Sequence, residues 1–344
     1  MKNIYLLSLH VFLCFNVFTN LFAYTGIIRN EHYSSLYKSA CVRPQAKYIM
    51  QVNNVRAGLL SGGDLFSVDG YISPSPRPGQ LPVSGISAAG VWLGGRDRAG
   101  NTKVAAVAYR NEGNDFFSGP LDINGTTEKN RCDQWDKIFT VKGSSIERHI
   151  QNYKIARELN IPMECDAIPD DIKYWPAQGN ANFIEKYNWL LPDQPLASYQ
   201  DMNNNGIYDP CQGDYPSFFS IHCEYPFHQG NRIPSEINFY IFNDNGGPQT
   251  LSGPSSMQAE FQVNAFAYAS NDEINDMTFY EYKIINKAAE DLIDCYFSWW
   301  VDPDLGCPED DYFGCDPFRN MAYIYNEDEV DGNPDQNCFG TNTY

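Results

Sequence analysis

Residues 261–270, FQVNAFAYAS, show that this chain forms β-structure. Apolar side chains at 261, 263, 265, 267 and 269 alternate with the set at 262, 264, 266, 268 and 270. A period of two sends successive side chains to opposite faces of a strand. The stretch therefore predicts a strand with two distinct faces.

The same pattern extends on both sides of this stretch. Residues 277–287 and 294–301 continue it, and the turns at 271–273 and 288–292 are short enough to join antiparallel neighbours. We therefore expect a meander there. An earlier hairpin is expected from 87–93 and 103–109, reversing near 97–101. With 15% aromatic residues, 26 Gly and 21 Pro, the fold class expected is mainly β: antiparallel sandwich-like sheets with one helix, long loops and a calcium-binding loop.

The one helix follows Ser144. Ser144 and Glu147 have the spacing of a capping box, and apolar residues at 146, 150, 153, 155 and 159 recur at helical spacing up to Pro162. His149 lies within this helix. Because no Ser, Cys or Asp partner for catalysis can be identified around it, we expect a surface histidine.

Residues 201–214, DMNNNGIYDPCQGD, have the composition of a calcium loop. Oxygen-bearing groups stand at alternate positions up to a forced turn at Gly206, and calcium takes six to eight oxygen ligands at about 2.3–2.6 Å. Gln212 replaces the usual exit glutamate, so Asp214 is the exit ligand expected. The predicted ligands are Asp201, Asn203, Asn205, the Ile207 carbonyl, Asp209 and Asp214. An Asx-rich turn without metal is the alternative.

A calcium ion in this loop would serve architecture, because the loop supplies no nucleophile or base beside an open position. A weaker metal candidate is a dense acidic cluster after the last expected strand. Its members are Asp302, Asp304, Asp310, Asp311 and Asp316. Their spacing fits no standard loop, and a solvated acidic loop is the alternative.

The N-terminus indicates export. Lys2 precedes an apolar run over 4–22, and Ala23 offers a small residue for cleavage, so residues 1–23 are expected to be a secretory signal peptide. A membrane anchor is the alternative. After cleavage no run approaches the roughly 20 apolar residues of a spanning helix. The chain is therefore expected to be secreted or at the cell surface.

The cysteines agree with export. Of the ten cysteines, only Cys14 lies in the expected signal peptide, and the others show no C-x-x-C pair. Disulfides are expected, with Cys211–Cys223 and Cys307–Cys315 as local pairs, although sequence leaves connectivity open. Free buried cysteines are the alternative.

The formal charge of −19 argues against nucleic acid as a partner, because phosphate binding requires a basic surface. It equally disfavours anionic membranes. The remaining partners are an extracellular protein or a glycan.

Several short motifs occur in a characteristic order. They are Asn53-Asn54-Val55-Arg56-Ala57, Gly62-Gly63-Asp64, Gly90-Val91-Trp92-Leu93-Gly94-Gly95, Gly113-Asn114-Asp115-Phe116-Phe117, Cys132 with Trp135-Asp136, Trp175-Pro176-Ala177, Gly213-Asp214-Tyr215-Pro216 and Trp300-Val301-Asp302-Pro303-Asp304. As a set they resemble the N-terminal region of large secreted Bacteroidota proteins. Such proteins commonly end in a type IX secretion sorting domain, so the resemblance implies a location rather than an activity. It also suggests that this chain is a fragment.

The expected organisation has five parts. After the signal peptide (1–23) come an N-terminal β-rich module (24–130), a helix-containing connector (131–200), the calcium-binding loop (201–216) and a C-terminal β-rich module (217–344). The two β-rich modules could instead form one continuous domain.

Three function classes fit these observations. A non-enzymatic structural, adhesion or interaction role is favoured, because it accounts for acidity, cysteines and aromatics together. Carbohydrate binding or glycoside hydrolysis is the alternative, through exposed Trp (Trp92, Trp175, Trp299, Trp300) and paired carboxylates. Trp299 and Trp300 are expected on opposite faces of one strand. A peptide or ester hydrolase lacks its G-x-S-x-G or H-E-x-x-H motif.

Overall fold

The computed structural model describes residues 40–73, 83–218, 232–326, 330–333 and 338–343. The expected signal peptide lies outside the described residues. The helices are α1 (Lys129–Trp135), α2 (Gly143–Leu159), α3 (Asp170–Lys173) and α4 (Phe183–Tyr187), with 3-10 turns η1 (Cys165–Ala167), η2 (Pro210–Gln212) and η4 (Glu273–Asp276). The strands are β1 (Lys47–Met50), β2 (Arg56–Leu60), β3 (Tyr71–Ser73), β4 (Val83–Ile86), β5 (Ala88–Arg96), β6 (Thr102–Ala106), β7 (Phe117–Ser118), β8 (Phe139–Lys142), β9 (Tyr199–Gln200), β10 (Tyr215–Pro216), β11 (Glu236–Asn243), β12 (Ala259–Ala267), β13 (Phe279–Asn286), β14 (Ile293–Asp302), β15 (Asp311–Asp316), β16 (Met321–Asn326), β17 (Val330–Asn333) and β18 (Cys338–Thr343).

The strands confirm a mainly β, antiparallel fold. One sheet has the order β13-β12-β11-β7, with β8 also paired to β11; we call it the central sheet. A second, the outer sheet, combines β14-β5-β6 with β1-β2-β3-β4 through bridges at Leu59, Leu65 and Ala89. Strands from before residue 143 and after residue 235 therefore pair within each sheet.

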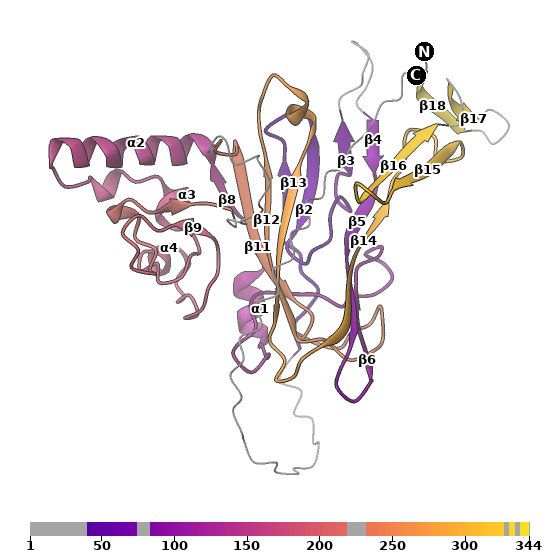
Figure 1. The fold of residues 1–344 in the computed structure, drawn as a ribbon, viewed down its shortest axis with the longest axis horizontal. Coiled ribbons are helices and arrows are strands. Elements are labelled where there is room, and N and C mark those ends of the chain that lie inside the picture. The colour runs from indigo at the N-terminus through magenta and orange to yellow at the C-terminus, as the bar shows by residue number, and fades with distance from the viewer. Residues whose placement is uncertain (1–39, 74–82, 219–231, 327–329, 334–337, 344) are drawn as a thin grey trace.

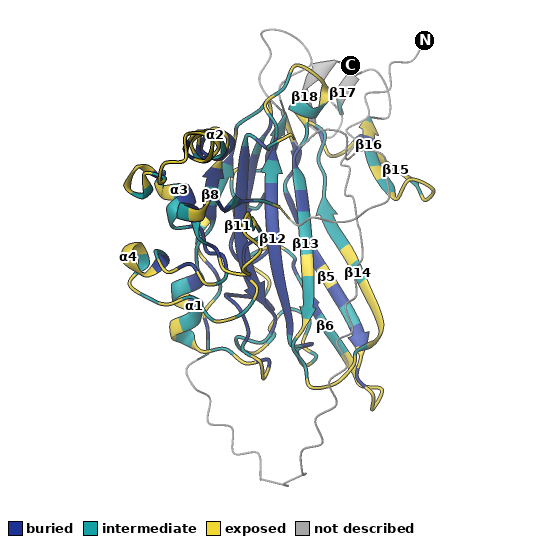
Figure 2. Cartoon of the chain, turned by 60° about the vertical axis from the view of Figure 1, so that its left-hand side comes forward, coloured by how far each residue is buried: buried dark blue, intermediate teal, exposed yellow. Residues whose placement is uncertain are grey.

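Three layers lie side by side in Figure 1. The outer sheet packs on one face of the central sheet. The other face of the central sheet is covered by a helical layer, residues 143–216, which holds α2, α3, α4 and the β9–β10 pair. The central sheet is therefore the interior layer, and Figure 2 shows β11 and β12 as its most buried strands.

The predicted alternation is confirmed over residues 261–267 of β12, whereas residues 268–270 lie beyond the strand and Ala269 is exposed. Phe261, Val263, Ala265 and Ala267 are fully buried in the core between the two sheets. Burying an aromatic side chain of this kind contributes about 2–3 kcal/mol. The polar face of β12 is also buried, beneath residues 192–197, where the Gln262 amide donates to the Pro195 carbonyl at 2.8 Å.

β11 is buried on both faces along its whole length. Tyr240 and Phe242 face the core between the sheets, whereas Ile237, Phe239 and Ile241 face the core under the helical layer. One strand therefore belongs to two hydrophobic cores.

The predicted meander is only half correct. β13 pairs with β12 as expected, but β14 crosses to the outer sheet and pairs with β5. The crossing lets Phe297, Trp299 and Val301 pack against the core from the opposite side. The predicted hairpin is confirmed as β5 and β6, and the Asp97 carboxylate closes its turn by accepting from the Asn101 backbone at 2.8 Å.

The predicted helix is confirmed as α2, but its capping box is wrong. Lys142 is the N-cap residue, and no side chain caps the helix there. The reason is that β8 stays paired with β11 up to Lys142, so the extended chain turns into the helix at Gly143. The helix ends at Leu159, and its C-cap residue, Asn160, is in the left-handed conformation.

Disulfides are present, but both predicted pairs are wrong. Cys211 bonds to Cys165 across 46 residues, and Cys41 bonds to Cys132 across 91. Cys307 is disulfide-bonded while Cys315 is free, so these two do not pair. Cys223 lies outside the described residues. The bonds found join segments far apart in the sequence, because the packing of the layers brings them together.

Candidate functional site

The predicted calcium loop lies at the edge of the helical layer, between β9 and β10. These two short strands pair antiparallel, with Tyr215 opposite Gln200 and Pro216 opposite Tyr199. The two ends of the loop are therefore held side by side. The disulfide from Cys211 to Cys165 ties the loop to the start of η1.

The first half of the loop is organised by its own side-chain oxygens. The Asp201 carboxylate accepts from the Gly206 N–H at 2.8 Å and the Asn205 N–H at 3.3 Å. Asn203 and Asn205 each accept from the backbone two residues on, at 3.1 and 2.8 Å. Gly206 has φ +76°, which favours glycine. The pKa of Asp201 is lowered, chiefly because the Gly206 N–H stabilises its charged form.

The second half is closed by Asp214, whose side chain is fully buried. Its two carboxylate oxygens accept from the Met202 and Asp209 N–H groups, each at 2.8 Å. Asp209 in turn caps η2 by accepting from the Cys211 N–H at 2.9 Å. Burial is the main cause that raises the pKa of Asp214, and the charges of Asp201 and Asp209 add to it.

Two hydrogen bonds anchor the loop to the rest of the helical layer. Tyr208 is buried and donates its hydroxyl proton to the Ile172 carbonyl at 2.8 Å. The expectation of a surface histidine at 149 is wrong: His149 is buried, with its Nε2 3.0 Å from the Asp214 carbonyl oxygen. The periodicity of α2 could not reveal this contact, because it depends on a segment 65 residues away. Burial lowers the pKa of His149.

All six predicted ligands of this loop carry oxygen, as calcium requires. The structure gathers Asp201, Asn203 and Asn205 around the same turn, whereas Asp214 is turned toward two backbone N–H groups. In the described residues, no three His, Cys, Asp or Glu side chains are grouped as a metal site would need. A cation in this loop would therefore depend on amide and main-chain oxygens as well as on carboxylates.

The weaker acidic candidate is dispersed over several elements, and each carboxylate has its own partner. Asp304 accepts from the Ser87 hydroxyl, Asp310 from the Gly332 N–H, and Asp311 from the Leu305 N–H. Asp316 pairs with Arg319 at the hairpin end of β15. Asp302, at the end of β14, hydrogen-bonds to the Tyr109 hydroxyl and thereby raises the pKa of Tyr109 to about 12.

The tryptophan candidates divide into buried and accessible ones. Trp175 belongs to the helical layer and is buried in its core against β11, and Trp299 packs against the core between the sheets, in contact with the Tyr282 ring. Trp92 and Trp300 lie on the opposite face of the outer sheet. The predicted division of Trp299 and Trp300 between two faces is confirmed.

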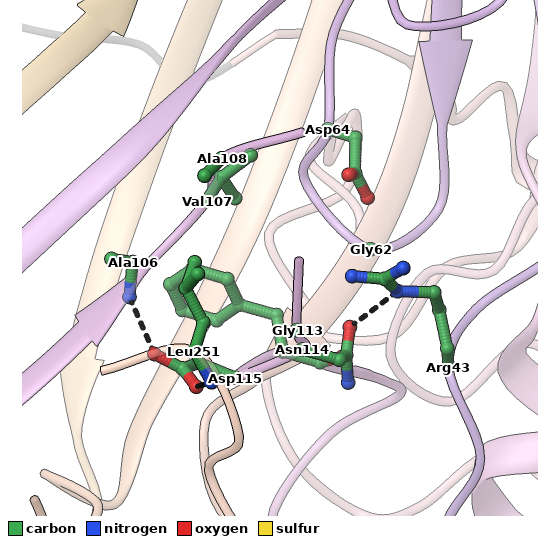
Figure 3. Close-up of a pocket in the computed structure, with 11 residues that line it drawn as sticks. Arg43, Gly62, Asp64, Ala106, Val107, Ala108, Gly113, Asn114, Asp115 and Leu251 are labelled. Carbon is green, nitrogen blue, oxygen red and sulfur yellow. Dashed lines mark hydrogen bonds between the residues drawn. The ribbon is translucent and has the colours of Figure 1, made fainter. Parts of the chain in front are cut away.

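A small pocket lies where the end of β6 and the segment that follows it, residues 106–116, meet Arg43 and the chain after β2 (Figure 3). Its charged groups already have partners. Arg43 donates to the Asn114 side chain at 3.2 Å, and Asp64 pairs with Arg110 at 3.1 Å. Asp115 accepts from the Ala106 N–H at 3.1 Å. These contacts give the pocket a structural role.

No protein-family model matches this chain, and no curated protein or solved structure matches it either. Among the helices described, none combines enough length with enough apolar character to span a bilayer. The function must therefore be inferred from the residues themselves.

Proposed function

We propose that this chain is a secreted or cell-surface β-protein, stabilised by calcium at residues 201–214, with a structural, adhesion or interaction role. The observation that carries the proposal is the anchoring of an oxygen-rich loop to the body of the protein. The β9–β10 pair, the Cys165–Cys211 bond and the buried Tyr208 all act on this loop. A cation bound there would stabilise the whole helical layer.

Export is supported by two features. Disulfides persist in oxidising compartments, and the structure holds Cys41–Cys132 and Cys165–Cys211. The resemblance to secreted Bacteroidota proteins adds to this, and a type IX secretion route is part of the proposal.

The proposed calcium ligands are Asp201, Asn203, Asn205, the Ile207 carbonyl and Asp209, with Asp214 closing the loop. The ion would neutralise the carboxylates and hold the turn, which is architectural chemistry. A non-enzymatic role is consistent with His149, which contacts the loop backbone and is buried.

Thermal unfolding of the chain with calcium and with chelator tests the proposal. A ligand that binds only the folded state stabilises it by about 2.7 kcal/mol at a concentration 100 times its Kd. We expect calcium to raise the midpoint of the wild type and of Asp133→Ala, an exposed carboxylate control. In Asp201→Ala the calcium-dependent rise should disappear.

Terbium luminescence provides a second readout that does not depend on the midpoint. Burial raises the pKa of Tyr199 and the nearby Asp201 charge adds to it, so Tyr199 is close enough to the loop to sensitise a bound lanthanide. Asn203→Ala should lower the luminescence without removing a charge. Equal calcium shifts in wild type and Asp201→Ala, with no terbium signal, would remove the metal from the proposal.

The second candidate function is carbohydrate binding or glycoside hydrolysis. It is favoured by the position of Trp92 and Trp300 on the open face of the outer sheet. Hydrolysis would also need a pair of carboxylates flanking the sugar.

A further inference from the structure

Four aromatic side chains cluster on the face of the outer sheet that points away from the core. Trp92 comes from β5, Tyr296 and Trp300 from β14, and Tyr109 from the segment after β6; we call this set the aromatic face. Tyr296 is 75% exposed, Trp92 44% and Tyr109 42%. Exposed aromatic side chains gathered in one place commonly mark a binding surface.

The strand register explains the exposure of Tyr296 and Trp92, whereas Trp300 is only partly exposed because the Val107 side chain fills the space at Gly90, opposite it. Tyr296 lies opposite Gly94, Trp300 opposite Gly90, and Trp92 between Ser298 and Ala106. The cross-strand neighbours are therefore small. A Cβ placed on Gly94 would find no atom nearer than the Lys103 carbonyl oxygen at 3.9 Å, so the surface beside Tyr296 is hollow.

Two of the rings are also fixed in orientation. The Trp92 indole N–H donates to the Val107 carbonyl at 2.6 Å. The Tyr109 ring meets Trp300 edge to face, with centroids 5.1 Å apart, and its hydroxyl is hydrogen-bonded to Asp302. The indole N–H of Trp92 and the hydroxyl of Tyr109 are therefore held by the protein, and the edge-to-face contact covers one ring face of the Tyr109–Trp300 pair. Fixed side chains lose little conformational entropy on binding.

We propose that the aromatic face binds a neutral oligosaccharide. The C–H faces of sugar rings stack on aromatic rings, while Asp302 and Asp304, which flank Tyr109, can accept hydrogen bonds from hydroxyl groups. Tyr296 and Trp300 are four residues apart on one strand, about 13 Å, which leaves room for more than one sugar ring.

The charge of the protein selects the class of glycan. A formal charge of −19 repels anionic polysaccharides and nucleic acids. The carboxylates of Asp302 and Asp304, beside Tyr109, also repel anionic ligands at the aromatic face itself. The face lies on the outer sheet and shares no residue with the calcium loop, so the two proposals can fail separately.

Isothermal titration with laminarin, xyloglucan, galactomannan and soluble starch tests this proposal, with polygalacturonate as the anionic probe. We expect at least one neutral polysaccharide to bind and polygalacturonate not to bind. Trp92→Ala should weaken binding at least tenfold. Phe318→Ala, which removes a fully exposed ring on the β15–β16 hairpin, should leave the affinity unchanged.

A second variant separates binding from folding. Gly94→Val adds bulk in open space and keeps every aromatic ring, so it should lower the affinity at an unchanged thermal midpoint. The proposal is overturned if no neutral polysaccharide binds, or if Trp92→Ala and Phe318→Ala bind equally well. Retained sugar binding without a calcium response would reject only the calcium proposal.

Discussion

Protonation of the buried Asp244 should make this protein more stable in mild acid. The Asp244 side chain is fully buried and accepts from the Met257 and Ala259 N–H groups. Burial raises its pKa from 3.8 to about 6, even though these N–H groups favour the charged form. Between about pH 4 and pH 6 the folded protein therefore holds a proton that the unfolded chain releases.

The size and sign of the effect follow from this difference. One pKa unit corresponds to 1.36 kcal/mol, so the shift amounts to about 3 kcal/mol. Because the folded-state pKa is the higher one, the contribution is fully present below pH 3.8 and is lost as the pH rises through about 6. Ionised Asp244 therefore lowers the free energy of unfolding at pH 7.

Urea unfolding of wild type and Asp244→Asn between pH 4 and pH 7, followed by tryptophan fluorescence, measures this contribution. The asparagine must direct its NH2 group at one of the two backbone N–H groups, at a pH-independent cost of about 1–3 kcal/mol. The decisive quantity is therefore the pH dependence of the difference in free energy of unfolding between the two proteins. From pH 7 to pH 4 we expect the free energy of unfolding of the wild type to rise by about 2–3 kcal/mol relative to that of Asp244→Asn. If the free energies of unfolding of the two proteins change in parallel with pH, the reasoning is refuted.

Two further substitutions test the packing. Replacing both Cys165 and Cys211 with Ala opens a cross-link spanning 46 residues, and should lower the free energy of unfolding by about 4 kcal/mol, measured by denaturant titration; a loss below about 1 kcal/mol would contradict this. Gly63→Ala should cost about 2–4 kcal/mol, because Gly63 has φ +83° and its Cβ would lie 2.5 Å from the Phe242 ring. The matched Gly100→Ala, at φ +85° with open space around it, should cost only about 1 kcal/mol in the same assay.

Local pattern was sufficient to predict some elements of this fold, but not β1–β3, β11 or the helices α1, α3 and α4. The alternation at 261–270 identified β12, and the spacing of apolar residues identified α2. Both signals arise from backbone geometry, which acts within a few residues. They could not identify partners: nothing near 293–302 indicates that β14 pairs with β5, some 200 residues earlier.

The candidate site was likewise predictable only where its features are local in the sequence. The oxygen-bearing positions from 201 to 209 could be recognised because their spacing is local. The anchors of that loop could not, since His149 and Cys165 reach it only through the packed helical layer. Likewise, sequence alternation separated Trp299 from Trp300, but the exposure of Trp92 depends on its small cross-strand neighbours.

The burial of β11 on both faces limits how the protein can be shortened. Deleting the helical layer to obtain a minimal sandwich would uncover Ile237, Phe239 and Ile241 together, in the middle of the central sheet. Such an apolar strip associates with other chains rather than with water. Engineering of this protein must therefore treat residues 143–216 as an integral wall of the fold, and any graft or fusion belongs on the outer sheet or beyond it.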